Sequence, residues 1–258
     1  MRLKVLACEV LTREICYLVA HSPHVIDLTF TKKDGHDLAE CLRQEIQREI
    51  DGANDEGYDA ILLGYGLCGN ATVELKARGI PLVIPRAHDC CTLFLGSRLK
   101  FKELFGDNPS QPFSSLGYME RGDQYSHSPA LRKILGLDRT YEDYVLQYGE
   151  ENAKYIMETL SLTLDLTEHQ QKVVYIEIPE THQPGAEEEF RQKAAADGKE
   201  FVQIRGDLSL LRNLLHGQWN EEDFLVVPPG ETIVGVYDWD TICRATRIEE
   251  KNDENLDS

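Results

Sequence analysis

The chain has 258 residues, of which 41% are apolar and 28% are charged, close to the averages of soluble globular proteins. It is long enough to bury a sizeable core without disulfide bonds. Its longest apolar runs fall far short of the roughly 20 residues that a membrane span requires. The net charge of −18 argues against nucleic acids and anionic membranes as partners.

The cysteine content indicates a reducing compartment. Residues 1–7 read into a short strand and lack the longer apolar core of a signal peptide. Seven cysteines, an odd number without an export signal, are expected to be thiols or metal ligands rather than a disulfide framework. We therefore expect a cytoplasmic protein.

The first third of the chain alternates strand and helix patterns. Strands are predicted at residues 3–8, 24–31, 59–65 and 80–85, with helices at 11–18, 37–49 and 71–78 between them. Such alternation predicts parallel βαβ units, and right-handed crossovers wind them into one open sheet. The predicted fold is α/β, a doubly wound parallel sheet whose Rossmann-like amino-terminal lobe has strand order 2-1-3-4.

The periodicity then stops and later restarts. Residues 105–128 are rich in Gly, Pro and Ser and are interpreted as a loop, a lid over the site with Phe113 and Tyr118 as apolar covers. A long helix is predicted at 141–162. Strands at 172–178, 200–206 and 223–228, with helices at 186–196 and 208–216, indicate a second, smaller α/β lobe or a continuation of one sheet.

These patterns predict four parts. They are a Rossmann-like lobe with the site and its lid at 1–128, a bridging helix within 129–165, a second α/β lobe at 166–248 and a disordered acidic tail at 249–258.

Three cysteines occupy equivalent places in the first lobe. Cys8 ends the first strand, Cys68 follows the third, and Cys90 lies just past the fourth. In strand order 2-1-3-4 these strands are neighbours, and ligands bind outside the carboxyl ends of the strands in such sheets. Because thiolates bind soft or borderline metals, we expect the three to hold zinc or an iron–sulfur cluster. One coordination position would stay free for substrate or for a fourth ligand such as His88 or Cys91.

The alternative for any cysteine is packing, since Cys behaves as a small buried hydrophobe. Cys16, Cys41 and Cys243 lie in periodic apolar segments and are assigned to the core. Cys8, Cys68 and Cys90 lie at strand ends and in turns, so a functional role is favoured for them.

Polar residues beside Cys90 suggest catalytic groups. His88 is a candidate ligand or proton shuttle, and Asp89 either orients it or caps the following helix. Arg86 is a candidate partner for an anionic substrate, with a surface salt bridge as the alternative.

The glycine-rich segment around Cys68 suggests a binding loop. Gly66, Gly69 and Asn70 allow tight turns and close backbone approach, so they are candidate cofactor-binding residues.

These signatures resemble a known family. The segments ACEVL at 7–11, LGYGLCGN at 63–70 and HDCCTLFLGS at 88–97 are similar to the domain of unknown function 1638. The likeness runs from the first strand to about Tyr155 and more loosely to Val234. The resemblance implies an anaerobic setting near corrinoid-dependent methyl-transfer systems, a small-molecule substrate from one-carbon metabolism, and a corrinoid protein or methyltransferase as partner. Residues 108–118 depart from the more aromatic family version, which implies a different substrate choice.

Three classes of function fit these observations. The first is a thiolate-ligated metalloenzyme, transferring methyl groups with zinc or carrying out desulfuration or redox chemistry with a cluster. The second is a metal-free cysteine-based acid–base or covalent catalyst of racemase or hydrolase type. The third is a non-enzymatic metal carrier or methyltransferase accessory protein.

Overall fold

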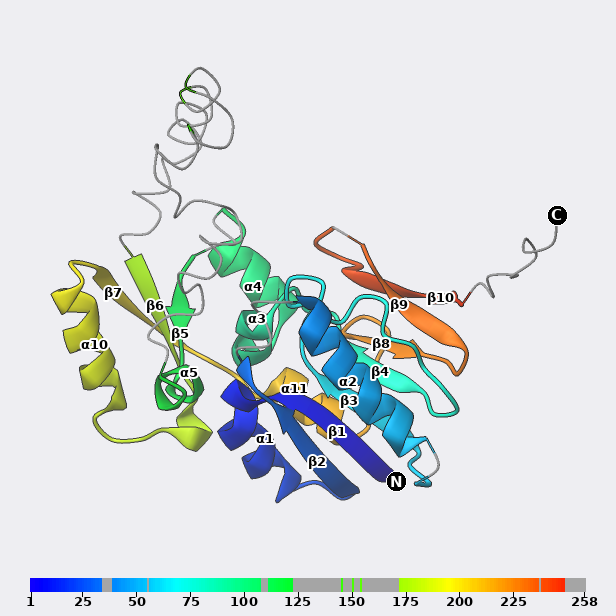
Figure 1. Ribbon diagram of the computed structural model, residues 1–258. Coiled ribbons are helices and arrows are strands. Elements are labelled where there is room, and N and C mark those ends of the chain that lie inside the picture. Colours follow the sequence, from blue (N-terminus) through cyan, green and yellow to red (C-terminus); the bar gives the residue numbers. More distant parts are fainter. Residues whose placement is uncertain are drawn as a thin grey trace.

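The computed structural model describes residues 1–33, 39–54, 56–107, 111–122, 145, 150, 154, 172–236 and 238–248. The predicted bridging helix, apart from three single residues, and the predicted tail lie outside the described residues. Among the elements described, strands form three sheets with helices packed around them (Figure 1). No helix in these ranges is long and apolar enough to cross a membrane.

The main sheet has five strands in the order β2-β1-β3-β4-β8. β1 pairs in parallel with β2 and β3, and β3 pairs in parallel with β4, which confirms the predicted order 2-1-3-4. β8 adds to β4 in the antiparallel direction. The strands are β1 (Arg2–Cys8), β2 (Val25–Thr31), β3 (Ala60–Gly64), β4 (Leu82–Pro85) and β8 (Phe224–Val227).

Helices cover both faces of this sheet. α1 (Thr12–Val19) and α11 (Ser209–Leu215) contact each other, and α11 also contacts β3 and β4. α2 (Ala39–Ala53) packs on β1 and β2 (Figure 1). The connection from β1 to β2 moves toward one edge of the sheet, and the connection from β2 to β3 moves back toward the other edge. Because both crossovers are right-handed, α1 and α2 lie on opposite faces of the sheet. All five residues of β3 are consequently buried.

Two smaller sheets flank the main one. A parallel sheet joins β5 (Phe113–Ser114), β6 (Lys172–Glu177) and β7 (Glu200–Arg205), and α10 (Ala186–Ala196) packs on β6 and β7. β9 (Glu231–Gly235) and β10 (Cys243–Arg247) form an antiparallel hairpin that was not predicted. Strand pairing crosses residue 128, since β5 joins β6 and β8 joins β4. The division into domains stays a prediction.

The segment predicted to be an irregular loop is largely regular where it is described. After α3 (Cys90–Leu95) and α4 (Arg98–Phe105), residues 111–122 contain β5 and the short helix α5 (Leu116–Glu120). The prediction of a loop was wrong here because β5 obtains its hydrogen bonds from β6, about 60 positions later in the chain. No local pattern signals such a distant partner.

The helix predicted at residues 71–78 is also wrong, because this segment consists of turns and one isolated bridge. Four residues in or just before this segment have φ between 47° and 71°, in the left-handed region: Cys68, Gly69, Asn70 and Glu74. A right-handed helix cannot continue through such residues. The segment forms turns, and its buried apolar side chains pack into the core from these turns.

Candidate functional site

Cys8 ends β1 and is followed directly by the short helix η1 (Glu9–Leu11). Its side chain is 2% exposed. Burial raises the pKa of the Cys8 thiol to about 11, while a hydrogen bond from the Val10 backbone and the charges of Lys33 and Arg121 partly offset that rise. Cys8 is therefore a buried thiol, and its position at the carboxyl end of a central strand agrees with the prediction.

Cys68 lies in an unusual backbone conformation just beyond β3. Its φ is 47°, and Gly69 and Asn70 follow at 62° and 71°. A single non-glycine residue in the left-handed region costs of order 1 kcal/mol, and such strain concentrates at functional sites. Gly69 adopts this conformation without strain because it has no Cβ atom. Cys68 has a Cβ atom, so its left-handed conformation is strained.

The loops that carry Cys68 and Cys90 lie side by side. The backbone amides of Leu67 and Cys68 donate to the carbonyls of Ala87 and His88 at 2.9 and 3.0 Å. A Cβ atom on Gly66 would come within 2.6 Å of the Asp89 backbone nitrogen, so only glycine permits this approach. The loops after β3 and β4 are thus joined by hydrogen bonds and by close packing.

Cys90 is the first residue of α3, directly after the N-cap residue Asp89. The Asp89 carboxylate accepts a hydrogen bond from the Thr92 amide at 3.4 Å, which is the capping role considered for this residue. Burial raises the pKa of Asp89 to about 6. The Cys90 sulfur, in turn, lies 2.8 Å from the Tyr118 hydroxyl of α5.

The three cysteines are within electrostatic reach of one another. Burial is the main cause of the raised pKa of Cys68, and the charges of Cys8 and Asp89 add to it. Burial also raises the pKa of Cys90 well above its ordinary value, with further increases from Asp89, Cys68 and Cys8. Without a bound metal ion, all three groups are protonated thiols at neutral pH. The structure therefore places the three cysteines at the carboxyl ends of neighbouring strands, and their sharing of one metal site stays a prediction.

Two buried tyrosines belong to the same surroundings. Tyr118 was expected only as an apolar cover, yet its hydroxyl bonds to Cys90 and its pKa is raised by burial and by the Cys90 charge. Tyr65 hydrogen-bonds to Thr31 at 2.7 Å, and Cys8 and Cys68 contribute to its raised pKa. Sequence reasoning missed the polar role of Tyr118, for which the chain offers no signal because Cys90 is 28 residues away.

The imidazole ring of His88 packs against aromatic side chains. The imidazole packs edge-on against Trp239, with ring centroids 5.3 Å apart, and lies 6.0 Å from the Phe101 ring. Burial lowers the pKa of His88, and its Nε2 atom has no hydrogen-bond partner among the described residues. His88 is therefore an aromatic-cluster residue in this structure, and its ligand or proton-transfer role stays a prediction.

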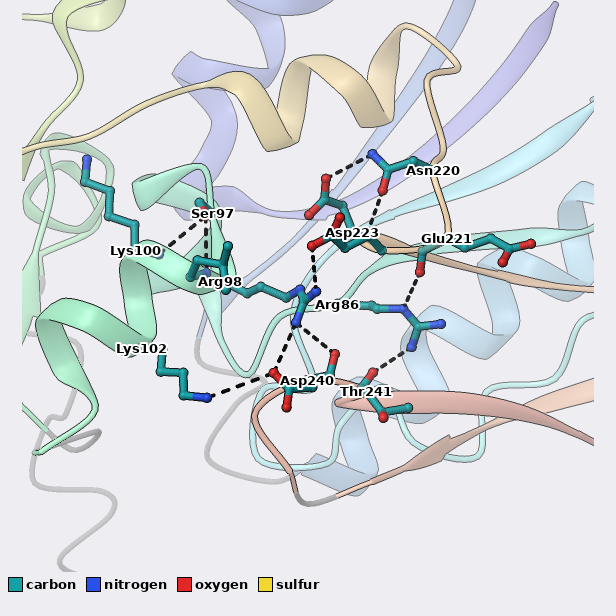
Figure 2. A network of polar contacts seen from close by, with 12 residues as sticks. Arg86, Ser97, Arg98, Lys100, Lys102, Asn220, Glu221, Asp223, Asp240 and Thr241 are labelled. Carbon is teal, nitrogen blue, oxygen red and sulfur yellow. Dashed lines mark hydrogen bonds and ion pairs between the residues drawn. The ribbon is translucent and has the colours of Figure 1, made fainter.

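Arg86 forms bonds to backbone carbonyls rather than to a site. Its guanidinium donates to Glu221 at 3.0 Å, to Thr241 at 2.6 Å and to Cys243 at 2.5 Å. Figure 2 shows its side chain between the segment before β8 and the β9–β10 hairpin, beside Arg98 and Asp240. These contacts give Arg86 a structural role, and nothing in them supports the predicted pairing with an anionic substrate.

The remaining loop candidates lie close to Cys68. Around the Cβ position of Gly69 there is no atom within 4 Å, so the turn borders open space. The Asn70 carbonyl accepts a hydrogen bond from Arg43 at 3.3 Å. The predicted binding role of Gly66, Gly69 and Asn70 stays a prediction, although Gly66 has the demonstrated packing role described above.

The assignment of the other cysteines to the core is partly wrong. Cys243 is fully buried, but Cys16 and Cys41 are exposed on α1 and α2. Each lies on the solvent side of an amphipathic helix. Cys91 is buried beside Cys90, and neither Cys8 nor Cys68 contributes to its raised pKa.

Within the ranges described, no group of three or more His, Cys, Asp or Glu side chains has the arrangement needed to hold a metal ion. The three cysteines are thus neighbours without forming a compact cage for one ion.

The fold and the site define a doubly wound α/β protein with a buried three-cysteine cluster at the carboxyl ends of its central strands. The chain belongs to the family described as protein of unknown function DUF1638, whose model matches residues 30–215. No curated protein matches the chain, and no solved structure matches it either.

Proposed function

We propose that Cys8, Cys68 and Cys90 bind an iron–sulfur cluster that acts on a small molecule. The observation that carries this proposal is that three buried cysteines lie at or just beyond the carboxyl ends of the neighbouring strands β1, β3 and β4. There the charge of Cys8 raises the pKa of Cys68, and the charges of Cys68 and Cys8 raise the pKa of Cys90. In a reducing cytoplasm the thiols are available as ligands. Positive charge in the site would offset the unfavourable burial of three thiolates.

The arrangement favours a cluster over a single zinc ion. Zinc–sulfur bonds of about 2.3 Å in a tetrahedron place the sulfurs about 3.8 Å apart, which is a compact group. No group suited to one ion occurs in the described ranges. In a cluster the thiolates bind different irons and lie farther apart. Three ligands leave one iron open, which suits substrate binding followed by redox or desulfuration chemistry.

The biological setting of this proposal comes from the family resemblance. It implies one-carbon or methyl metabolism in an anaerobe, with a corrinoid protein or methyltransferase as partner. The acidic surface implied by the net charge of −18 fits a protein or small-molecule partner better than a nucleic acid. A methyl-transfer enzyme with zinc and a non-enzymatic metal carrier are the neighbouring alternatives, separated by metal identity and by activity.

Metal-free thiol catalysis is the second candidate, and the hydrogen bond between Cys90 and Tyr118 is the observation in its favour. Its weakness is that the thiolate is the nucleophile, while burial raises the pKa of all three thiols. At neutral pH the site without a cation would be largely unreactive. Metal-free protein with full activity would select this candidate.

The decisive experiment is elemental analysis of protein purified without oxygen. We expect stoichiometric iron and acid-labile sulfide in the wild type, and loss of both in Cys8→Ser, Cys68→Ser and Cys90→Ser. Cys91→Ser is the matched control, since Cys91 is buried in the same helix turn, while neither Cys8 nor Cys68 contributes to its raised pKa. It should retain the metal. Zinc without iron would show that the proposed metal is wrong. Absence of any stoichiometric metal would overturn the proposal.

A further inference from the structure

We propose that Tyr118 is a positioning residue of this site, whose hydroxyl donates a hydrogen bond to the Cys90 sulfur and thereby tunes the metal centre. The Tyr118 oxygen lies 2.8 Å from the Cys90 sulfur, and both side chains are buried. The inference rests on the proposed function, because it assigns a regulating role within the same site.

The direction of this hydrogen bond follows from the chemistry of the ligand. Either atom is able to donate while Cys90 is a thiol. A cysteine bound to metal has lost its proton, so only the tyrosine O–H retains a hydrogen to donate. The contact then becomes a hydrogen bond to an anionic acceptor, which is stronger than a neutral one.

Aromatic packing fixes the orientation of the Tyr118 ring. The ring meets Phe113 edge-on with centroids 5.5 Å apart, and it lies 6.4 Å from the Phe94 ring. These contacts involve the ring and not the hydroxyl. Replacing Tyr118 by Phe therefore removes the hydrogen bond and preserves the packing.

The short helix that carries Tyr118 is fastened to the end of β1. A Cβ atom on Gly117 would collide with the backbone of η1, so α5 and η1 are in direct contact. Arg121 forms an ion pair of 3.1 Å with Glu9, and Arg13 holds Glu120 with bonds of 2.5 to 2.8 Å. These contacts hold α5, and with it the tyrosine, in a fixed place over the site.

A hydrogen bond to a ligating sulfur has a defined effect on the metal. It draws negative charge from the sulfur and stabilises the reduced state, which carries one more electron, so it raises the reduction potential of a cluster. Loss of the Tyr118 hydroxyl should therefore shift the potential to a more negative value. In a cobalt-substituted zinc site the same loss should shift the thiolate-to-metal absorption band to longer wavelength.

Tyr65 provides a matched control. It is 1% exposed, and its hydroxyl forms a 2.7 Å hydrogen bond to Thr31 rather than to a sulfur. Cys8 and Cys68 contribute to its raised pKa, so it lies in the same electrostatic surroundings. Tyr65→Phe removes a buried hydrogen bond of similar length without touching Cys90.

The test compares wild type, Tyr118→Phe and Tyr65→Phe, all purified without oxygen, with metal content measured first. An iron centre is then titrated for its midpoint potential, and a zinc centre is replaced by Co²⁺ for absorption spectroscopy. We expect equal metal content and a shift in Tyr118→Phe alone. An unchanged Tyr118→Phe protein, or an equal shift in Tyr65→Phe, overturns the role of Tyr118 while leaving the proposed function intact. A wild type without metal overturns both.

Discussion

Two regions that begin at the end of β4 differ in how the polar groups of their side chains are stabilised. Arg86 makes three hydrogen bonds to carbonyls and connects β4 with the β9–β10 hairpin (Figure 2). Four residues later, Cys90 enters a cluster of thiols that burial and mutual repulsion keep protonated. In the first region the guanidinium of Arg86 finds its hydrogen-bond acceptors among the backbone carbonyls of the chain. The second combines a left-handed backbone conformation at Cys68 with buried thiols whose pKa is raised, the combination expected of a functional site.

Arg86→Ala offers the largest expected effect on stability. Hydrogen bonds to charged groups contribute about 1.5–3 kcal/mol each, and removal of the guanidinium also leaves three carbonyls without their donor. We expect the free energy of unfolding to fall by about 2–4 kcal/mol, measured by urea denaturation. Folded Arg86→Ala protein should keep its metal. Loss of metal at unchanged stability would show that the two regions are not separate.

Gly66→Ala is expected to affect both stability and the site. The added Cβ would meet the Asp89 backbone at 2.6 Å, so the loops that carry Cys68 and Cys90 must move apart. Such overpacking costs about 1–3 kcal/mol. Metal content should fall with it. Gly69→Ala is the contrasting variant, since nothing lies within 4 Å of its Cβ position and only its left-handed φ opposes the change. Equal metal loss in both variants would argue against the close-approach explanation.

The order of the first four strands was predictable because alternating patterns and right-handed crossovers leave few topologies. The same reasoning located Cys8, Cys68 and Cys90, since carboxyl strand ends meet at one edge of the sheet. β8 was recognised as a strand, but its antiparallel place beside β4 depends on a pairing more than 130 residues distant. Local patterns carry no information on such partners.

Side-chain direction accounts for the errors in the site. His88 and Cys90 are two residues apart, yet the ring of His88 joins Trp239 while the sulfur of Cys90 joins Tyr118. Asp89 between them adopts an extended conformation as the N-cap, which turns the chain. Sequence spacing places residues in one loop but does not say which way each side chain points.

Glu14 extends the comparison to a buried carboxyl outside the cysteine cluster. It is 1% exposed, accepts a hydrogen bond from Thr181 at 2.7 Å, and has a second oxygen without a partner in the described residues. Burial raises its pKa, a change that Arg13 opposes and Glu120 reinforces. A raised carboxyl pKa gives stability that is present at acidic pH and is lost as pH rises through the folded-state value.

Glu14→Gln should therefore stabilise the protein at neutral pH, by on the order of 1 kcal/mol. The difference from wild type should shrink below the ordinary pKa of a glutamate, where both side chains are neutral. Denaturant melts across that pH range check this expectation. A difference that is constant with pH would assign the effect to packing instead of ionisation.

The smallest effects are expected at Cys16 and Cys41, which are exposed on α1 and α2. Substitutions at exposed positions usually change stability by less than about 0.5 kcal/mol. Serine at either position should therefore leave the unfolding midpoint and the metal content unchanged. Cys243→Ser supplies the contrast, because Cys243 is fully buried and a hydroxyl there costs about 1–3 kcal/mol unless it finds a hydrogen-bond partner. It should lower stability but keep the metal. The same Cys→Ser change is thus compared at two exposed positions and one buried position, none of which is a proposed ligand. Metal loss in any of the three variants would place a ligand outside the proposed cluster.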